Sequence, residues 1–410
     1  MTYFFETYGC QMNSAESAAL DLVCRERGWT AAGDGESADL VLLNTCSVRA
    51  TAEQRVMGRL AHYAALKKKR TGRPLTLVVA GCMAERLGNS LKEKCPAVDY
   101  IMGTSARSIF PLILEAVEKG RSFEETIEQP VFSFSSSHME AGAFRSFVPI
   151  MHGCNNFCSY CIVPYVRGRE ISRDPAAILE EIRLVGERGV REITLLGQNV
   201  NTYQYGSLDF PGLLRLIAAE LERGPLKGTV RRVRFLSANP KDFSQEAIEV
   251  MAEYPVFCRH LHLCVQHGSD RILSAMNRGY TREAYLDLVR RIRKAIPGIT
   301  FSTDILVGFP GETEEDLEET FALMDEVKFL YAYMYHYNPR EGTAAFLLPN
   351  RVEDAVKKER LARVIKKQQA HTVELLKSRI GSRETVLIEG ISRKNADELI
   401  CRTEKDEMAV

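Results

Sequence analysis

Apolar and polar positions alternate along the chain in a way that predicts two successive α/β series. In the first series, short apolar runs at residues 4–10, 41–46 and 77–82 predict strands, and amphipathic patterns at about 14–28 and 50–69 predict helices. Strands that alternate with helices in this way form parallel sheets. The segment is therefore predicted to be a βαβαβ unit.

The second series is longer and predicts a partial barrel. Amphipathic helices such as 176–188 and 282–295 separate six strand candidates, at residues 147–152, 192–198, 230–237, 259–266, 300–307 and 330–337. Six β/α units make an incomplete barrel, whose ligand site is expected at the carboxyl ends of its strands. A basic helical pattern and two more strand candidates follow, at residues 351–379, 386–391 and 399–402.

These patterns divide an α/β chain into domains. We expect an N-terminal domain at residues 1–122, a polar, serine-rich linker at 123–145, the barrel at 146–350, the basic helix at 351–379 and a β segment at 380–410. With 410 residues, of which 45% are hydrophobic, the chain can bury a core in each of two or three domains.

The balance of charge limits the expected partners. Lysine and arginine total 54, as do aspartate and glutamate, so no overall field draws the chain to nucleic acid or to a membrane. Any RNA-binding face must be local. We see neither a signal peptide nor a run of about 18 uncharged apolar residues, so a cytoplasmic protein without a membrane partner is expected. In that reducing compartment, the 11 cysteines indicate metal binding or chemistry rather than disulfides.

Three of the cysteines, Cys154, Cys158 and Cys161, lie close together in the sequence. Zinc sites usually take four ligands from two separated pairs, whereas three local thiolates hold three irons of a 4Fe-4S cluster and leave the fourth iron open. An open iron can bind a small molecule. Because the first barrel strand leads directly into this loop, the cluster is expected at the carboxyl-terminal mouth of the barrel.

Three further cysteines, Cys10, Cys46 and Cys82, each end one strand of the first series. Parallel strands bring their carboxyl ends to one edge of a sheet, so these thiols are expected to meet there and to hold a second cluster with an open iron. The alternative is three unrelated buried thiols, since free cysteine is commonly buried. No such placement favours a ligand role for the remaining thiols Cys24, Cys95, Cys258 and Cys401.

Two polar features mark the barrel strands. In residues 259–266, a period of two puts His260, His262, Cys264 and Gln266 on the face expected to line the lumen. We interpret the two histidines as hydrogen-bonded lumen residues, with metal binding as the alternative. In the run from Asp304 to Glu312, a strand is followed by a turn whose glycines, Gly308 and Gly311, allow close approach of a ligand or simply provide turn geometry.

The basic residues of the helix at 351–379 have two interpretations. They are Lys357, Lys358, Arg360, Arg363, Lys366 and Lys367. They form either a solvated helix face or a surface that contacts RNA phosphates, where counterion release would strengthen binding.

Specific strings of residues resemble a known family. The C-x3-C-x2-C triplet after a first barrel strand is similar to the radical S-adenosylmethionine superfamily, and the three N-terminal cysteines narrow the resemblance to its methylthiotransferases. Within these, the chain resembles the MiaB-type tRNA 2-methylthio-adenosine synthases, in the strings 8–13, 44–46, 80–82, 153–158, 162–170, 196–200 and 276–281.

The resemblance implies an activity and its cofactors. In such enzymes the cluster at Cys154, Cys158 and Cys161 binds S-adenosyl-L-methionine and yields a 5′-deoxyadenosyl radical. The second 4Fe-4S cluster, at Cys10, Cys46 and Cys82, carries the sulfur that is methylated and delivered to C2 of N6-dimethylallyladenosine next to the tRNA anticodon. An electron donor such as flavodoxin or ferredoxin and a sulfur or cluster donor system are the expected partners.

The remaining site residues are assigned with the same family in view. Residues expected to line the cofactor pocket are Gln198, Asp304, Gly308 and Gly311. Residues expected to hold the backbone of the tRNA anticodon loop, while the target base is splayed out, are Arg167, Arg169 and Arg173.

The chain departs from the family pattern at two places. Members usually have proline and serine where this chain has Cys264 and His267, which affects the expected shape of the pocket. Residues 381–410 resemble only the first half of the RNA-binding TRAM β-barrel, and such a half barrel leaves unpaired edges. A disordered tail and weaker RNA binding than in a member with a full TRAM domain are expected.

Three other activities remain as alternatives. Related enzymes methylthiolate threonylcarbamoyl-adenosine in tRNA or an aspartate of a ribosomal protein. A two-cluster electron carrier is the alternative without an organic substrate. It is disfavoured because electron carriers generally close each cluster with four protein ligands.

Overall fold

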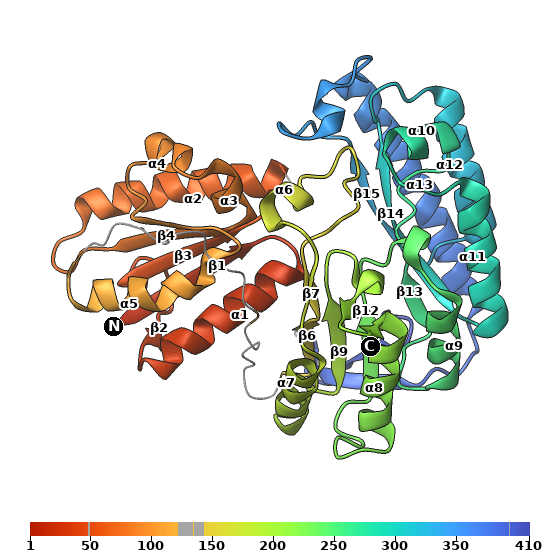
Figure 1. Ribbon diagram of the computed structural model, residues 1–410, viewed down its shortest axis with the longest axis horizontal. Coiled ribbons are helices and arrows are strands. Elements are labelled where there is room, and N and C mark those ends of the chain that lie inside the picture. The colour runs from red at the N-terminus through yellow and green to blue at the C-terminus, as the bar shows by residue number, and fades with distance from the viewer. Residues whose placement is uncertain (48–49, 122–133, 135–142, 393) are drawn as a thin grey trace. The chain divides into compact units, whose positions relative to one another are not determined.

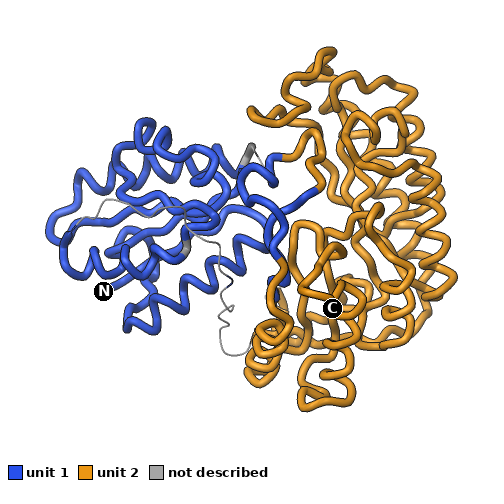
Figure 2. The backbone as a smooth tube through the Cα atoms, in the orientation of Figure 1, with its two compact units in different colours: residues 1–140, 147–155, 162–171 blue, residues 141–146, 156–161, 172–410 orange. Residues whose placement is uncertain are grey.

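The structure is a computed structural model that describes residues 1–47, 50–121, 134, 143–392 and 394–410. The chain forms two compact units (Figure 2). Unit 1 contains residues 1–140, 147–155 and 162–171, and unit 2 contains residues 141–146, 156–161 and 172–410. Most of the predicted linker at 123–145 lies outside the described residues, and the predicted domain boundaries stay predictions. None of the described helices is both long and apolar enough to span a bilayer.

Unit 1 is built on a five-stranded parallel sheet in the order β2-β1-β3-β4-β5 (Figure 1). Its strands are β1 (Thr2–Tyr8), β2 (Thr30–Ala31), β3 (Leu40–Thr45), β4 (Thr76–Gly81) and β5 (Tyr100–Met102). Its helices are α1 (Gln11–Glu26), α2 (Ala50–Lys69), α3 (Cys82–Leu87), α4 (Ser90–Lys94), α5 (Phe110–Glu118) and α6 (Val163–Arg167), with a 3-10 turn at Ala106–Ile109. The predicted parallel βαβαβ unit is confirmed.

The sheet of unit 1 is covered on both faces. Leu40 and Leu42 pack with α1 and α5 on one face, whereas Val41 and Leu43 pack with α2 and α3 on the other. A strand that is buried on both faces has a continuous apolar sequence, which is why β3 and β4 were readable from the sequence. Because helices cover both faces, the carboxyl ends of the strands are left to carry polar groups.

Unit 2 contains the predicted barrel strands as two parallel groups. One group pairs β9 (Glu192–Leu196) with β12 (Arg232–Phe235), and the start of β6 (Arg145–Pro149) lies on the other side of β9. The second group has the order β13 (His260–His262), β14 (Thr300–Val307) and β15 (Tyr331–His336). Parallel bridges from Val233 to Phe257 and from Ala238 to Leu263 connect the two groups.

Helices between these strands complete the β/α series (Figure 1). They are α7 (Pro175–Glu187), α8 (Phe210–Glu222), α9 (Gln245–Glu253), α10 (Asp270–Ala275), α11 (Arg282–Ala295) and α12 (Glu314–Val327). Shorter elements are β7 (Met151–His152), β8 (Ile171–Ser172), β10 (Gln204–Tyr205) and β11 (Leu208–Asp209), and 3-10 turns at Val200–Thr202, Pro240–Asp242 and Ala344–Leu347. The α/β class and the parallel strand order agree with the sequence prediction.

The predicted basic helix is α13 (Asp354–Ser378), and much of its charge is paired with acidic residues within unit 2. Arg360 is buried and donates to Glu312 (2.9 Å), and Lys367 pairs with Asp325 (2.8 Å). Further ion pairs join Arg363 to Glu314 and Glu318. The helix is therefore neither a purely solvated face nor an open phosphate-binding surface, and phosphate contact stays a prediction for the exposed Lys358 and Lys366.

The tail is an ordered antiparallel sheet of β16 (Val386–Ile391), β17 (Leu399–Thr403) and β18 (Met408–Ala409), so the expectation of a disordered tail is wrong. Two buried arginines of β12 hold it to the barrel. Arg232 donates to the carbonyls of Arg402 (2.8 Å) and Thr385 (3.0 Å). Arg234 donates to those of Glu404 (2.8 Å) and Thr403 (2.9 Å).

Deleting residues 381–410 is expected to destabilise unit 2 by at least ~3 kcal/mol. The deletion removes four carbonyl acceptors from two buried guanidinium groups, and each such charge-assisted hydrogen bond contributes about 1.5–3 kcal/mol. Thermal unfolding followed by circular dichroism measures the effect. Lys405→Ala, which removes only an ion pair within the tail, is the control and should change little. An unchanged unfolding temperature after the deletion would show that the tail is not part of the folded core.

Candidate functional site

Three cysteines of unit 1 lie at the carboxyl edge of its sheet. The register pairs Tyr8 with Thr45 and Thr45 with Gly81, so the three strands end level with one another. Cys46 follows β3 directly, Cys82 follows β4 directly, and Cys10 caps the start of α1 two residues beyond β1. Cys46 and Cys82 are buried and Cys10 is exposed. The expected gathering at one edge is what the register produces, and the ligand role stays a prediction.

Two asparagines hold these chain ends in place. The side-chain oxygen of Asn13 accepts hydrogen bonds from the Cys10 amide (3.2 Å) and thiol (3.4 Å), and its amide group donates to Asn44 (3.0 Å) and to the Thr45 carbonyl (3.2 Å). Asn44 in turn donates to the Asn13 carbonyl (2.9 Å) and to Ser17 Oγ (3.0 Å). This network also explains why α1 begins at Gln11, earlier than the periodicity predicted.

A glycine is required beside this network. Gly81 has a φ of +90°, which a side chain rarely adopts. A Cβ atom there would lie 2.5 Å from both the Asn44 side-chain oxygen and the Thr45 carbonyl oxygen. The Ala-Gly-Cys string at residues 80–82 therefore allows β4 to approach β3 closely at the point where the thiols meet.

A buried ion pair lies near two of these thiols, Cys82 and Cys10. Arg167, the last residue of α6, donates to Glu16 of α1 at 2.7 Å, and both side chains are about 5% exposed or less. The position of α6 is set by packing of Ile162 and Val166 against Cys82. Burial lowers the pKa of Arg167, but the neighbouring acidic groups Cys82 and Glu16 outweigh this effect and raise it, so the guanidinium is charged.

The two buried arginines do not fit the RNA role predicted for them. Arg167 is enclosed with Glu16, and Arg173 is buried in an ion pair with Glu181. A guanidinium enclosed in this way is not presented to a phosphate backbone, so the prediction for Arg167 and Arg173 is corrected. Arg169 is exposed, and its RNA contact stays a prediction.

Replacing Glu16 with alanine is expected to lower the free energy of unfolding by ~3–5 kcal/mol. The substitution leaves the buried Arg167 charge without its carboxylate, which is the costly way to break a buried ion pair. Denaturant unfolding of the metal-free protein measures the change. Glu180→Ala, at an exposed pair with Arg183, should give no measurable change. If the two variants unfold alike, the Glu16 pair contributes no more than a surface one.

The donors of unit 1 fit an anionic iron-sulfur cluster. Burial raises the pKa of Cys82 to about 12, partly offset by Arg167, so a metal would have to displace the thiol proton. Arg167 Nη2 is buried and has no hydrogen-bond partner among the described residues. Three thiols and one unsatisfied cationic donor are the groups that a three-thiolate cluster needs, because hydrogen bonds to sulfur stabilise it. The other thiols of this unit, Cys24 and Cys95, lie in the hydrophobic cores.

The first part of the second cysteine loop is fixed within unit 1. The Cys154 amide donates to the Gly168 carbonyl (3.1 Å), and Asn155 donates to Glu170 through its backbone (3.1 Å) and side-chain (3.2 Å) amides. Gly153 has a φ of +80°, and a Cβ atom there would lie 2.0 Å from the Arg169 carbonyl oxygen. These contacts explain the glycine before Cys154 and the glutamate at the end of string 162–170.

The second part of the loop is fixed within unit 2. The Cys161 amide donates to the Cys158 carbonyl (2.9 Å), which forms a tight turn. The Ser159 amide donates to the Met276 carbonyl (3.0 Å), and Asn277 donates to the Phe157 carbonyl (3.1 Å). Arg278 Nη1 donates to Cys158 Sγ at 3.3 Å. String 276–281 resembles the family in sequence, but its residue types do not by themselves indicate these contacts.

The polar face of the barrel strands is hydrogen-bonded as interpreted. His260 contacts Thr300 (2.8 Å) and Ser302 (2.9 Å), and His262 contacts Ser302 (3.0 Å) and Asp304 (3.4 Å). Burial raises the pKa of Asp304, but hydrogen bonds from His262 and Cys264 outweigh it and lower the pKa. The ligand atoms of His262, Cys264 and Asp304 lie within 4.8 Å of one another, but these hydrogen bonds already satisfy the set.

The structure gives a separate reason for each of two predicted cofactor-binding residues, Gln198 and Asp304. Gln198, just after β9, has a buried side-chain oxygen without a hydrogen-bond partner among the described residues, and Asn199 has another. Such groups favour a polar ligand at this place. Asp304 holds a lowered pKa and is available as an anion. Both assignments stay predictions.

The two predicted glycines are accounted for by contacts within the protein. The Gly308 amide donates to Glu312 (2.7 Å), and a Cβ atom there would lie 2.4 Å from Lys357 Cγ. The Gly311 amide donates to the Asn350 carbonyl (2.8 Å). His267, one of the departures from the family pattern, is fully buried beside Glu312 (3.3 Å). Gly308 is therefore required by packing, whereas Gly311 is favoured by its φ of +79°, which a side chain rarely adopts, and a cofactor role for both stays a prediction.

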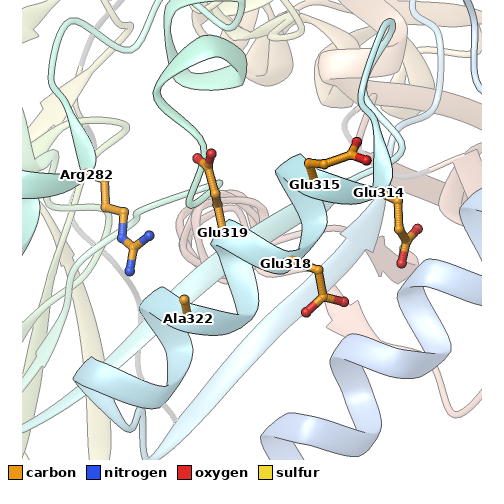
Figure 3. Close-up of a pocket in the computed structure, with 6 residues that line it drawn as sticks. All are labelled: Arg282, Glu314, Glu315, Glu318, Glu319 and Ala322. Carbon is orange, nitrogen blue, oxygen red and sulfur yellow. The ribbon is translucent and has the colours of Figure 1, made fainter.

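A surface depression lies elsewhere, along the acidic face of α12 (Figure 3). Its volume is about 440 Å³, and its lining residues are Arg282, Glu314, Glu315, Glu318, Glu319 and Ala322. None of these is a predicted site residue. The depression plays no part in the assignment of the site.

Comparison with known proteins places both parts of the chain. Residues 148–324 match the radical SAM superfamily, and residues 2–103 match the family described as uncharacterized protein family UPF0004. Among solved structures, the radical S-adenosylmethionine methyltransferase TsrM from Kitasatospora setae has a TM-score of 0.65 at 17% identity, over 84% of this chain and 74% of that one. The cobalamin-dependent radical enzyme OxsB has a TM-score of 0.55 at 9% identity, over 90% of this chain and 56% of that one.

Curated relatives match along the full length. The tRNA-2-methylthio-N(6)-dimethylallyladenosine synthase of Treponema pallidum is 49% identical over 100% of this chain and 92% of the relative. The synthase of Treponema denticola is 48% identical over 100% of this chain and 93% of the relative. The synthase of Geobacter sulfurreducens is 44% identical over 97% of this chain and 89% of the relative.

The barrel strands and the cysteine loop together define a radical S-adenosylmethionine enzyme. The identity and coverage of the curated relatives are high enough to go further. The chain belongs to the tRNA-2-methylthio-N(6)-dimethylallyladenosine synthase family.

Proposed function

We propose that this enzyme is a tRNA methylthiotransferase that converts N6-dimethylallyladenosine next to the anticodon to its 2-methylthio derivative. Full-length similarity to synthases of that name supports the activity. The observation that supports it in the structure is the level ending of β1, β3 and β4, which brings Cys10, Cys46 and Cys82 to one edge of the sheet, where the buried Arg167 interacts electrostatically with Cys82 and Cys10. A radical S-adenosylmethionine enzyme that works with one cluster does not need this second set of three cysteines.

The cysteines are proposed to hold two 4Fe-4S clusters. Cys10, Cys46 and Cys82 would hold one of them, and Cys154, Cys158 and Cys161 would hold the other. When bound, such clusters supply an electron for cleavage of S-adenosyl-L-methionine and an open iron for sulfur chemistry. The protein itself fixes the thiols through Asn13, Asn44 and the segment that follows α10.

Residues of unit 2 are proposed to bind S-adenosyl-L-methionine. The side-chain oxygen of Gln198, which has no hydrogen-bond partner among the residues that the structure describes, can accept a hydrogen bond from a ligand amino or hydroxyl group. The ionised carboxylate of Asp304 can pair with a cationic group, because His262 and Cys264 keep its pKa low.

The tRNA and other partners follow from the activity. The exposed Arg169, together with Lys358 and Lys366 of α13, is proposed to contact the phosphates of the anticodon loop. The target base must leave its stack to be reached. A flavodoxin or ferredoxin is proposed as the electron donor, and a sulfur or cluster donor as the source of the inserted sulfur. The cytoplasm is the compartment that provides them.

An anaerobic assay with matched RNA substrates tests this function. The purified chain is reconstituted with iron and sulfide, then incubated with dithionite, S-adenosyl-L-methionine and an anticodon stem-loop that carries N6-dimethylallyladenosine. We expect 5′-deoxyadenosine and a methylthiolated nucleoside by mass spectrometry. The same stem-loop with threonylcarbamoyl-adenosine, and a ribosomal-protein peptide, are the controls. Product only from a control would change the substrate, and an absence of 5′-deoxyadenosine throughout would refute the radical chemistry.

A further inference from the structure

Arg278 is a buried arginine with an unusual set of partners. The residue is 7% exposed, and each of its three nitrogens donates a hydrogen bond. Nη1 donates to Cys158 Sγ (3.3 Å), Nη2 to the Cys264 carbonyl (2.9 Å) and Nε to Tyr280 Oη (3.0 Å). The partners are a sulfur, a carbonyl and a hydroxyl, and none is a carboxylate.

Other buried arginines of the chain are paired with carboxylates. Arg167 pairs with Glu16, Arg234 pairs with Glu192, and Arg360 pairs with Glu312. For Arg278, no carboxylate lies within salt-bridge distance in the part of the chain that the structure describes, and its charge acts only from farther away on Asp304, whose pKa it helps to lower. A buried cation without an anion is strongly destabilising. Of its three partners, the Cys158 sulfur is the one that becomes an anion when it ligates a metal.

The guanidinium is held rigidly in this orientation. Its carbon lies 5.3 Å from the centroid of the Tyr280 ring, and the Tyr280 hydroxyl donates to the carbonyls of Cys264 (3.1 Å) and Val265 (2.7 Å). The preceding residue, Asn277, has a φ of +56° and donates to the Phe157 carbonyl (3.1 Å). The segment 277–280 therefore contacts the cysteine loop at two points, at the backbone through Asn277 and at the Cys158 sulfur through Arg278.

A fixed positive donor at a ligand sulfur has a defined electrochemical effect. Reduction adds an electron and makes an iron-sulfur cluster more negative. Hydrogen bonds to sulfur and nearby positive charge stabilise that state and raise the reduction potential. The effect persists in a buried site because solvent does not screen it.

We propose that Arg278 is a positioning residue that holds the Cys158 sulfur and raises the reduction potential of the cluster bound there. The proposal rests on the proposed function only in assigning Cys158 as a cluster ligand. Arg278 thereby makes the cluster easier for a physiological electron donor to reduce, and it does so without contacting the substrate.

Potentiometric EPR of the full-length reconstituted chain tests the proposal. The measurement uses a background with Cys10, Cys46 and Cys82 replaced by alanine, so that the Cys158 cluster gives the only signal. In that background we expect Arg278→Gln to lower the ratio of reduced to oxidised cluster at a fixed potential about tenfold, which is a shift of about 59 mV for a one-electron couple. An unchanged potential in a variant with full iron content would overturn the proposal.

A matched control and a second variant keep the test decisive. Arg293→Gln removes an exposed arginine of α11 that donates to the Val327 carbonyl and lies over Phe301, and it should not shift the potential. If Arg278→Gln fails to retain iron, Arg278→Met decides, since methionine fills the site with a flexible apolar side chain but keeps neither the charge nor the donors. A lower potential supports the proposal and an unchanged one overturns it. RNA plays no part in this readout, so failure here is distinct from failure of the methylthiotransferase assay.

Discussion

Replacing Cys158 with alanine is expected to abolish formation of 5′-deoxyadenosine from S-adenosyl-L-methionine. The substitution removes one of three thiolates in the loop and leaves Arg278 facing an apolar methyl group. A cluster held by the two remaining thiolates would be lost or unable to present one open iron. Chromatography of anaerobic reactions with dithionite measures the product. Iron content is expected to fall by about half, because one of two four-iron clusters is lost.

The control for this variant is another buried cysteine of unit 2. Cys258 is 4% exposed and has Arg234 as a neighbour, and it lies outside the predicted ligand set. Cys258→Ala should retain both iron and 5′-deoxyadenosine formation. If Cys158→Ala still cleaved the cofactor, Cys264 would be the first residue to test, since its thiol lies close enough to interact electrostatically with Cys158. Loss of activity only in a double variant would then redefine the ligand set.

Replacing Cys46 with alanine is expected to separate the two halves of the reaction. The enzyme should still form 5′-deoxyadenosine, because Cys154, Cys158 and Cys161 are untouched, but it should make no methylthiolated RNA. Cys46 is buried where β3 ends, beside the Asn44 network, so a smaller side chain there changes little else. Mass spectrometry of digested RNA and cofactor analysis in the same reaction give both readouts.

Cys95→Ala is the matched control within unit 1. Cys95 lies in the hydrophobic core that α2 forms with the sheet, so its loss should cost stability but not product. Methylthiolated RNA from Cys46→Ala would exclude Cys46 as an essential ligand. Loss of 5′-deoxyadenosine as well would show that the two sites are not independent.

Much of the fold followed from local patterns. The apolar runs of β3 and β4 and the amphipathic repeat of α11 have periods that depend only on neighbouring residues, so they were readable directly. The start of α1 was missed because its cap, Cys10 with Asn13, does not follow the usual Ser, Thr or Asp signal. The tail was misjudged because its stability comes from Arg232 and Arg234, which are about 170 positions away in sequence.

The candidate site, like the fold, could be predicted from the sequence only in part. The cysteine spacing was visible in the sequence, whereas the groups that surround the thiols were not. Asn13 and Asn44 join two strand ends, Glu16 meets Arg167 across 151 positions, and Cys158 meets Arg278 across 120. A signal was present, since each of these residues except Glu16 falls within a family string. The role of each such residue became clear only when the structure showed which distant residue it contacts.

The sequence by itself determined the α/β class, the level placement of Cys10, Cys46 and Cys82, and the spacing of Cys154, Cys158 and Cys161, because spacing and periodicity are properties of adjacent residues. Tertiary structure alone decided which arginines are buried beside sulfur and which are exposed. It removed Arg167 and Arg173 from the RNA surface and brought Arg278 to Cys158. The physical reason is that the environment of a charge depends on residues distant in sequence, since a buried guanidinium is stable only where folding supplies its acceptors.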